Sequence, residues 1–336
     1  MGAFLSHLGI LVVAPDEDED VAGYKKMMGA QNYALKFGDH TYTIDWMAPS
    51  SLPLFVGAEA YNATKNKDGF TFKKFTDALS RISEPMFELS CLSGVQSALE
   101  SIQYAEDRNI VTDLLVDMAS SYAAQAIPTI GGQFARTIDD TQRNAYYKDK
   151  NSWLPAVVES FINKTMAKIP GVSKLLPEKV DRWGRTQKYG SLPERVLENF
   201  ASPGYYSKEA PTWTDSRIMS IYKKTGDEGV IPKNADRSFE VNGERKYLSA
   251  DEYVEYSKEK GQLSYKYVTE FLRIPADIDD ETRVKIIKSI YEYSNAKAKE
   301  KVSDYELPAE YQKVDKAMKK GTSPAKYYYK YHTSKK

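Results

Sequence analysis

Residues 239–302 have the sequence FEVNGERKYLSADEYVEYSKEKGQLSYKYVTEFLRIPADIDDETRVKIIKSIYEYSNAKAKEKV, and this stretch decides the fold. Its first residues alternate apolar and polar side chains on either side of Asn242-Gly243. This dipeptide is the strongest sequence signal for a two-residue turn between antiparallel strands. The pattern therefore predicts a short β-hairpin over residues 239–247.

A helix start follows this hairpin directly. Ser249 precedes Glu252 by three residues, which is the spacing of a capping box, where each side chain accepts a hydrogen bond from the other residue's backbone N–H. The pattern predicts a helix over residues 250–260, and we expect Gly261 to end it. Two further helices are predicted over residues 264–274 and 277–302, the last with acidic residues in its first turn and lysines in its last. We expect residues 239–305 to form a small helical unit with a hairpin at its entrance.

The chain beyond this unit, residues 306–336, is a basic tail rich in tyrosine. Residues 313–336 contain eight lysines and one acidic residue. Lysine and tyrosine together suit contact with the phosphates and bases of nucleic acid, and that interpretation assigns the contact to Lys326, Tyr328, Lys330 and Tyr331. The alternative, which the general disorder of chain ends favours, is a solvated and frayed terminus.

A second hairpin is predicted near the N-terminus, where residues 32–46 alternate apolar and polar side chains around Gly38-Asp39. Pro53 favours the first position of the helix that follows. The apolar run over residues 4–14 lacks the basic start and the small-residue cleavage site of a signal peptide, so no signal peptide is predicted. We expect this run to be the end of a longer helix that lies outside the core and packs against an upstream polypeptide or another copy. The alternative is a short N-terminal core helix.

Helices predicted over residues 71–82 and 85–104 precede the longest uncharged stretch of the chain. Residues 118–135 are eighteen consecutive uncharged residues, many of them small. One interpretation is a close-packed helix pair broken at Pro128, and the other is a hairpin that inserts into a membrane, where small residues allow tight helix contact. On either interpretation, membrane or partner contact is assigned to Leu115, Met118, Tyr122, Ala126 and Ile130.

Seven prolines divide residues 151–238 into short pieces, with helices predicted over residues 154–167 and 193–199. We expect this region to be a wrapping connector. The predicted fold class is mainly α with two short β-hairpins: a multi-helix bundle, an irregular Pro-rich connector and a small C-terminal helical unit. The chain is accordingly divided into a helical region (1–150), the connector (151–238), the helical unit (239–305) and the basic tail (306–336).

Composition and motifs exclude several kinds of function. The 336 residues include 47 basic and 47 acidic side chains and one cysteine, Cys91, which excludes an internal disulfide and a cysteine-based zinc site. The three histidines are far apart, so we expect no histidine-ligated metal. Phosphate-binding loops and hydrolase motifs are absent. Helix starts explain the pairs Asp139-Asp140 and Asp279-Asp280, so we expect neither catalysis nor a cofactor.

Several strings nevertheless resemble one family. They are QNY at 31–33, YTIDWMAP at 42–49, PLFVG at 53–57, PTIGGQ at 128–133, ARTID at 135–139, VNG at 241–243, LSADEY at 248–253 and YEYSNAKAK at 291–299. Together they resemble the C-terminal portion of the tape-measure-like and large polyvalent internal virion proteins of tailed phages and prophages. Members of that family are much longer, and this chain starts at what would be their final quarter.

The resemblance implies a non-enzymatic virion structural protein, in the tail or inside the particle, that acts in genome delivery through the cell envelope. It implies other virion proteins or an upstream polypeptide as partners, and a virion location after synthesis in the cytoplasm of the host bacterium. The matching strings carry no catalytic chemistry, so no active residue is transferred. Two alternatives stay open: a nucleic-acid-binding or partner-binding module of a mobile element, which would use the basic tail, and an envelope-degrading hydrolase.

Overall fold

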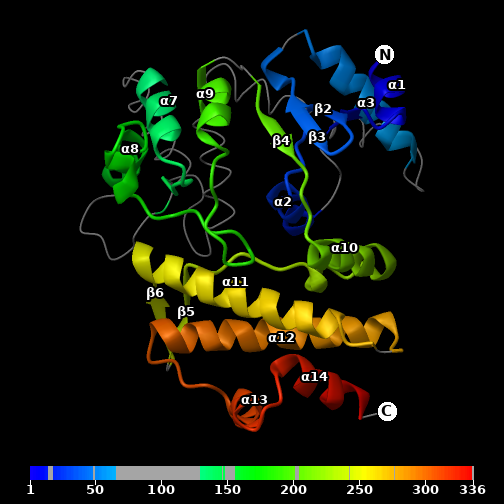
Figure 1. Ribbon diagram of the computed structural model, residues 1–336, viewed down its shortest axis with the longest axis vertical. Helices are drawn as coiled ribbons and strands as arrows, with labels where there is room; N and C mark the ends of the chain where they lie inside the picture. Colours follow the sequence, from blue (N-terminus) through cyan, green and yellow to red (C-terminus); the bar gives the residue numbers. More distant parts are fainter. Residues whose placement is uncertain are drawn as a thin grey trace.

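The computed structural model describes residues 1–13, 18–47, 50–65, 129–145, 147, 156–200, 204–241, 243–275 and 277–334. Within these residues the fold is mainly helical, with one four-stranded and one two-stranded antiparallel sheet (Figure 1). The prediction of a mainly α fold with two short hairpins is confirmed. The predicted helices over residues 71–82 and 85–104 lie outside the described residues.

The first sheet joins distant parts of the chain. Its strands lie in the order β1 (Leu11–Val12), β2 (Ala34–Phe37), β3 (His40–Thr43) and β4 (Tyr206–Lys208), each antiparallel to the next. The β2–β3 pair is the hairpin predicted around Gly38-Asp39. Strand β4, in contrast, comes from the region expected to be a connector, and Ser207 pairs with Thr41, 166 residues earlier.

The apolar N-terminal run does not form one helix. Helix α1 (Gly2–His7) ends before a turn, and β1 follows. Leu11 and Val13 are 2% and 3% exposed, in a cluster with Phe55 of α3 (Leu52–Lys65). The expectation of a helix end outside the core is therefore wrong. The backbone of β1 pairs with the edge of β2. The side chains of Leu11 and Val13 pack against Phe55 of α3.

The C-terminal part of the chain forms layers of helices, which we call the C-terminal body. Helix α11 (Ala250–Leu272) runs along α12 (Asp280–Val302), with α10 (Trp213–Thr225) on one side and α13 (Ala309–Lys319) and α14 (Pro324–Thr333) on the other (Figure 1). The hairpin of β5 (Ser238–Val241) and β6 (Glu244–Tyr247) leads into α11. Gly243 has φ 86°, as its turn requires, and both hydrogen bonds of the Ser249 capping box are present, so these two predictions are confirmed.

Gly261 lies in the middle of α11 and does not end it. A Cβ atom at this position would lie 2.1 Å from the backbone nitrogen of Gly184 and 2.4 Å from the carbonyl carbon of Trp183. The glycine therefore lets a distant loop pack directly on the helix backbone. The predicted break at Gly261, with a separate helix over residues 264–274, is wrong because close packing, and not chain termination, requires the glycine.

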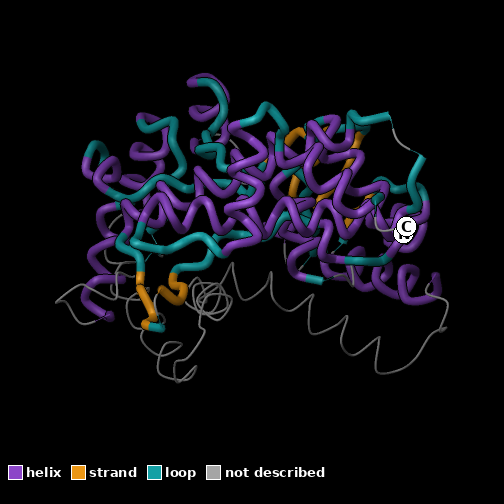
Figure 2. The backbone as a smooth tube through the Cα atoms, turned by 90° about the horizontal axis from the view of Figure 1, so that it is seen from below, coloured by secondary structure: helices purple, strands orange, loops and turns teal. Residues whose placement is uncertain are grey.

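The remaining described elements lie in different parts of the molecule. They are α2 (Glu19–Met27), α7 (Thr129–Ile138), α8 (Ala156–Met166), α9 (Leu192–Phe200) and the 3-10 turns Asp45–Met47, Val172–Leu175 and Glu228–Val230. Helices α8 and α9 confirm the two helical pieces predicted in the Pro-rich region. Helices α7, α8 and α9 lie far from α13 and α14 (Figure 1), and the second view shows the two sheets apart with helices between them (Figure 2).

The largest buried cluster lies around α10, α11 and α12. It contains Ile218, Tyr267, Phe271, Ile287, Ile290 and Tyr293, and it extends to α2 and to the C-terminal helices. Among the described residues, this cluster includes no side chain of α7, α8 or α9. The core is therefore concentrated in the C-terminal body.

Candidate functional site

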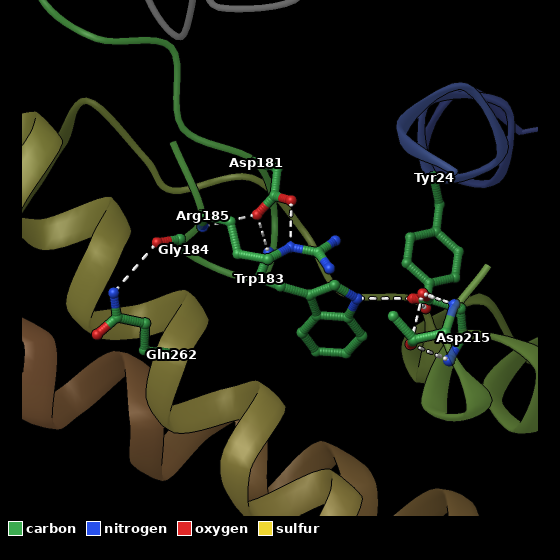
Figure 3. Close-up of polar contacts among 8 residues, drawn as sticks. Tyr24, Asp181, Trp183, Gly184, Arg185, Asp215 and Gln262 are labelled. Atoms are coloured by element: carbon green, nitrogen blue, oxygen red, sulfur yellow. Dashed lines mark hydrogen bonds and ion pairs between the residues drawn. The ribbon is translucent and has the colours of Figure 1, made fainter. Parts of the chain in front are cut away.

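A buried carboxylate joins three parts of the chain. Asp215 is 1% exposed and is the third residue of α10, whose capping box it forms with Thr212. Its Oδ1 accepts hydrogen bonds from the Tyr24 hydroxyl at 2.6 Å and the Trp183 indole N–H at 2.7 Å (Figure 3). Its Oδ2 accepts bonds from the backbone N–H and the hydroxyl of Thr212. All four donors belong to the protein, so this carboxylate acts as a cross-link between α2, the Trp183 loop and α10.

The Trp183 loop is itself fixed by an aspartate. Asp181 accepts hydrogen bonds from the backbone N–H groups of Trp183 and Arg185, and it pairs with the Arg185 side chain at 2.7 Å. Gln262 of α11 donates to the carbonyl of Gly184 (Figure 3). Burial raises the pKa of Tyr24, and the nearby Tyr291 and Asp215 raise it further, so the phenol stays protonated and remains a donor.

The acidic pairs have structural partners. Asp139 binds Arg143 and Asp140 binds Lys188, while Asp279 caps α12 through the backbone N–H of Thr282. Asp279 starts a helix as predicted, whereas Asp139 and Asp140 follow the C-terminal end of α7, so the prediction of a helix start at that pair is wrong. Within the described parts of the chain, no three metal-ligating side chains gather at one point.

An exposed apolar surface lies on α7 and α9, and we call it the α7–α9 face. It consists of Phe134 and Ile138 of α7 and Leu192, Pro193, Val196, Leu197 and Phe200 of α9. Leu197 is 61% exposed and Ile138 is 56% exposed, and α9 has no buried residue. The α9 side chains line a shallow hollow, and the rings of Phe134 and Phe200 meet edge to face with centroids 5.1 Å apart.

Polar contacts hold these two helices together. Thr137 accepts a hydrogen bond from Arg195 at its carbonyl and another from Asn199 at its hydroxyl, and Arg136 donates to Asn199. Because hydrogen bonds make much of this contact, large apolar side chains are left towards solvent. Partial removal from water raises the pKa of Glu198, and Glu194 one turn earlier adds to that effect, so the rim of the face carries two repelling carboxylates.

Most of the residues predicted to contact a membrane or a partner lie outside the described residues, so the structure does not place them relative to the α7–α9 face. Leu115, Met118, Tyr122 and Ala126 lie outside the described residues, and Ile130 lies in the first turn of α7. Among the residues described, no helix is both long and apolar enough to cross a bilayer. The α7–α9 face was missed in the sequence, although Leu192, Val196 and Phe200 recur every four residues and so share one side of a helix.

The second exposed surface is basic and lies on α13 and α14. It consists of six exposed lysines, which we call the lysine surface: Lys313, Lys316, Lys319, Lys320, Lys326 and Lys330. Among the described residues, none of these six side chains forms an ion pair with a carboxylate. The nearby Asp315 is turned inward, where it accepts from the Tyr293 hydroxyl at 2.6 Å and pairs with Lys297 at 3.1 Å.

The tail expected to be frayed is folded through residue 333. Val314 and Ala325 are fully buried, and Tyr328 is 7% exposed against the core, so the expectation of a solvated terminus is wrong. Tyr328 is also corrected as a nucleic-acid contact, because its ring packs inside and offers no face to a base. Lys326, Lys330 and Tyr331 are exposed, as that interpretation requires. Ser323 followed by Pro324 was the available signal for this helix.

No family model, no curated protein and no solved structure matches the chain.

Proposed function

We propose that the chain is a non-enzymatic structural protein of a tailed-phage or prophage particle, and that it binds another particle protein through the α7–α9 face. The observation that carries this proposal is the exposed apolar side of α9, on a helix pair held together by polar contacts. The chain would be made in the cytoplasm of the host bacterium and would work in the virion, in the tail or inside the particle, during genome delivery.

Burial of the α7–α9 face would drive the association. Contiguous apolar patches on protein surfaces commonly mark interaction sites. Transfer of one large apolar side chain from water into an interface contributes about 1.5 to 3 kcal/mol before the costs of association. Leu192, Val196 and Phe200 form a stripe along α9, with Phe134 beside it on α7. An amphipathic helix of the partner, with apolar residues three and four apart, would fit this stripe.

The resemblance to phage proteins supports a structural role because the matching strings contain packed positions. Phe55, in the PLFVG string, is fully buried beneath the first sheet. Tyr293 and Ser294, in the YEYSNAKAK string, are 1% and 0% exposed on α12. In this chain these positions build the folded body. The likeness therefore supports a shared scaffold and offers no reactive group.

The test is whether the chain enters particles through this face. Particles from a lysogen that carries the gene would be purified and analysed by mass spectrometry, with wild type, Leu197→Glu/Phe200→Glu and the control Phe37→Glu, which alters an equally exposed side chain on the first sheet. We expect wild type and the control in the particles and loss of the double variant.

Three results would contradict the proposal. The chain could be absent from particles, or the double variant could enter them normally. A double variant that unfolds at a much lower temperature than wild type would show that the chain covers this face itself. The non-enzymatic part fails separately if the purified chain releases products from peptidoglycan.

A further inference from the structure

The lysine surface lies at the opposite end of the molecule from the α7–α9 face (Figure 1), so protein docking at that face leaves it unused. We infer that the lysine surface binds the phosphate backbone of double-stranded DNA without sequence preference. This inference goes beyond the proposed structural role and does not depend on it.

The first argument is charge. Six lysines lie within eighteen residues on two successive helices, in a chain whose formal net charge is zero. Among the described residues none of the six forms an ion pair, although Glu300, Asp304 and Glu306 line one hollow with Lys316 and Lys319. Asp315, the acidic residue among them in sequence, points into the body. Because the formal net charge of the whole chain is zero, the positive charge is a feature of this surface and not of the whole molecule. A local surface of unneutralised ammonium groups attracts a polyanion and releases its counterions.

The second argument is that the fold holds these lysines in place. Lys326 and Lys330 are four residues apart on one side of α14, and Tyr328, two residues from each, packs on the opposite side. On α13, Val314 is fully buried on the side away from Lys316 and Lys319. Because the buried sides anchor both helices, binding requires only the lysine side chains to become ordered.

The third argument selects the duplex over a single strand. Proteins that bind single strands present aromatic rings on which bases stack. Here Tyr328 is buried, and among the described residues of α13 and α14 Tyr331 is the one exposed aromatic side chain, its ring parallel to that of Tyr327, so these helices present no row of free rings. Lysine is a compact point charge that meets phosphates without reading bases. The surface therefore fits phosphates of a duplex backbone.

An anionic membrane fits this surface less well. Helices that bind a bilayer surface place apolar side chains beside their basic ones, so that the apolar side enters the lipid. On α13 and α14 the apolar sides of Val314, Ala325 and Tyr328 are already packed into the body. Binding to anionic vesicles but not to DNA would therefore show that the lysine surface binds a membrane instead of DNA.

The experiment measures binding of the full chain to a fluorescently labelled random-sequence duplex by anisotropy, at salt concentrations between about 0.05 and 0.2 M. Lys326→Gln/Lys330→Gln and Lys313→Gln/Lys316→Gln each remove two charges from the surface. Lys223→Gln/Lys224→Gln removes two exposed charges from the end of α10 and serves as the matched control. Circular dichroism melts check that every variant is folded.

If most of the six lysines meet phosphates, log K should fall with log salt concentration with a slope of about −4 to −5. Each surface double variant should reduce the steepness by about 2 and weaken binding at low salt about tenfold or more, while the control should match wild type. The assignment is overturned by no duplex binding at the lowest salt concentration, by equal loss in the control, by tighter binding to a single strand of the same sequence, or by binding to anionic phosphatidylserine vesicles but not to DNA.

Discussion

The C-terminal body and the α7–α9 unit, which comprises α7, α8 and α9, divide buried and exposed side chains in opposite ways. In the body, large side chains such as Ile287, Ile290 and Tyr293 are at most 1% exposed. In the α7–α9 unit the buried residues are small or polar, as at Ala135, Thr137 and Ser160, while large apolar side chains face solvent. The body thus uses its apolar surface to fold, and the α7–α9 unit leaves apolar surface free.

Two helices of similar length show what decides the difference. Helix α14 is the last of the chain and buries Pro324, Ala325 and Tyr328 against α12. Helix α9 lies in mid-chain and buries none of its residues. Their positions in the chain would suggest the reverse, since termini fray more readily. What matters is whether a helix finds an apolar surface to cover, and only α14 does so within the described structure.

The largest expected effect is in the body, at its buried carboxylate. Asp215→Ala leaves the Tyr24 hydroxyl and the Trp183 indole N–H without their acceptor, and each buried donor left alone costs about 1 to 3 kcal/mol. We expect a loss of about 3 to 5 kcal/mol in the free energy of unfolding, measured with urea. Asp140→Ala, just after α7, removes an exposed pair with Lys188 and a hydrogen bond from the neighbouring Thr141 hydroxyl, and it should leave the urea midpoint nearly unchanged. Equal midpoints for the two variants would break the comparison.

A matched pair of aromatic truncations tests the two helices directly. Tyr328→Ala on α14 should cost about 3 kcal/mol because it leaves a cavity in the core. Phe200→Ala on α9 should cost only about 1 kcal/mol, because its side chain is 44% exposed and its ring contact with Phe134 is the main interaction lost. Thermal melts of both variants would settle this. A large loss in Phe200→Ala would show that the α7–α9 face is buried in the intact chain.

Two helical glycines should respond to alanine with opposite signs. In α11, Gly261→Ala places a Cβ against the backbone of Gly184, and the resulting overpacking should cost about 2 kcal/mol. In α7, the nearest atom to a Cβ on Gly132 is Lys168 Cγ at 3.5 Å, an ordinary contact, so the higher helix propensity of alanine should stabilise by about 0.5 to 1 kcal/mol. Stabilisation by Gly261→Ala would contradict the close packing described for α11.

The last prediction concerns the stability of the C-terminal body at alkaline pH. Burial raises the pKa of Tyr256, whose hydroxyl donates to Asn295, so the folded protein keeps a proton that the unfolded chain loses above about pH 10. This contribution to stability is complete below pH 10 and is lost as the pH rises further. Between pH 10 and 11 we expect Tyr256→Phe to lose about 1 kcal/mol less than wild type in urea titrations. Parallel losses in the two proteins would contradict this.

Local signals in the sequence were sufficient for the elements that depend on neighbouring residues. The hairpin of β5 and β6 with its turn at Gly243, the Ser249 capping box and the helix after Asp279 all formed as predicted, because caps and turns satisfy backbone groups close in the chain. The capping box of Thr212 and Asp215 offered the same signal for α10 and was overlooked. Element types were therefore accessible wherever the chemistry was local.

Long-range contacts account for the rest. The role of Gly261 depends on Gly184, which is distant in the chain, and β4 is a strand only because β3 offers it an edge. For the candidate sites, composition identified Lys326 and Lys330 as surface charges, but it could not show that Tyr328 packs inward. Nor could helical spacing reveal that the apolar side of α9 is the uncovered one, because spacing identifies a face and not its neighbour.

The pairing of β3 with β4 can form only after the ribosome has synthesised β4. Ser207 is made 166 residues after its partner Thr41, which at about 5 to 20 residues per second is a wait of about 10 to 30 s on the ribosome. During that interval the outer edge of β3 has backbone groups with no strand beside them, and such edges recruit other chains. The N-terminal sheet therefore cannot be completed as it emerges. Slower translation before residue 208 would lengthen the period in which nascent chains can aggregate through this edge.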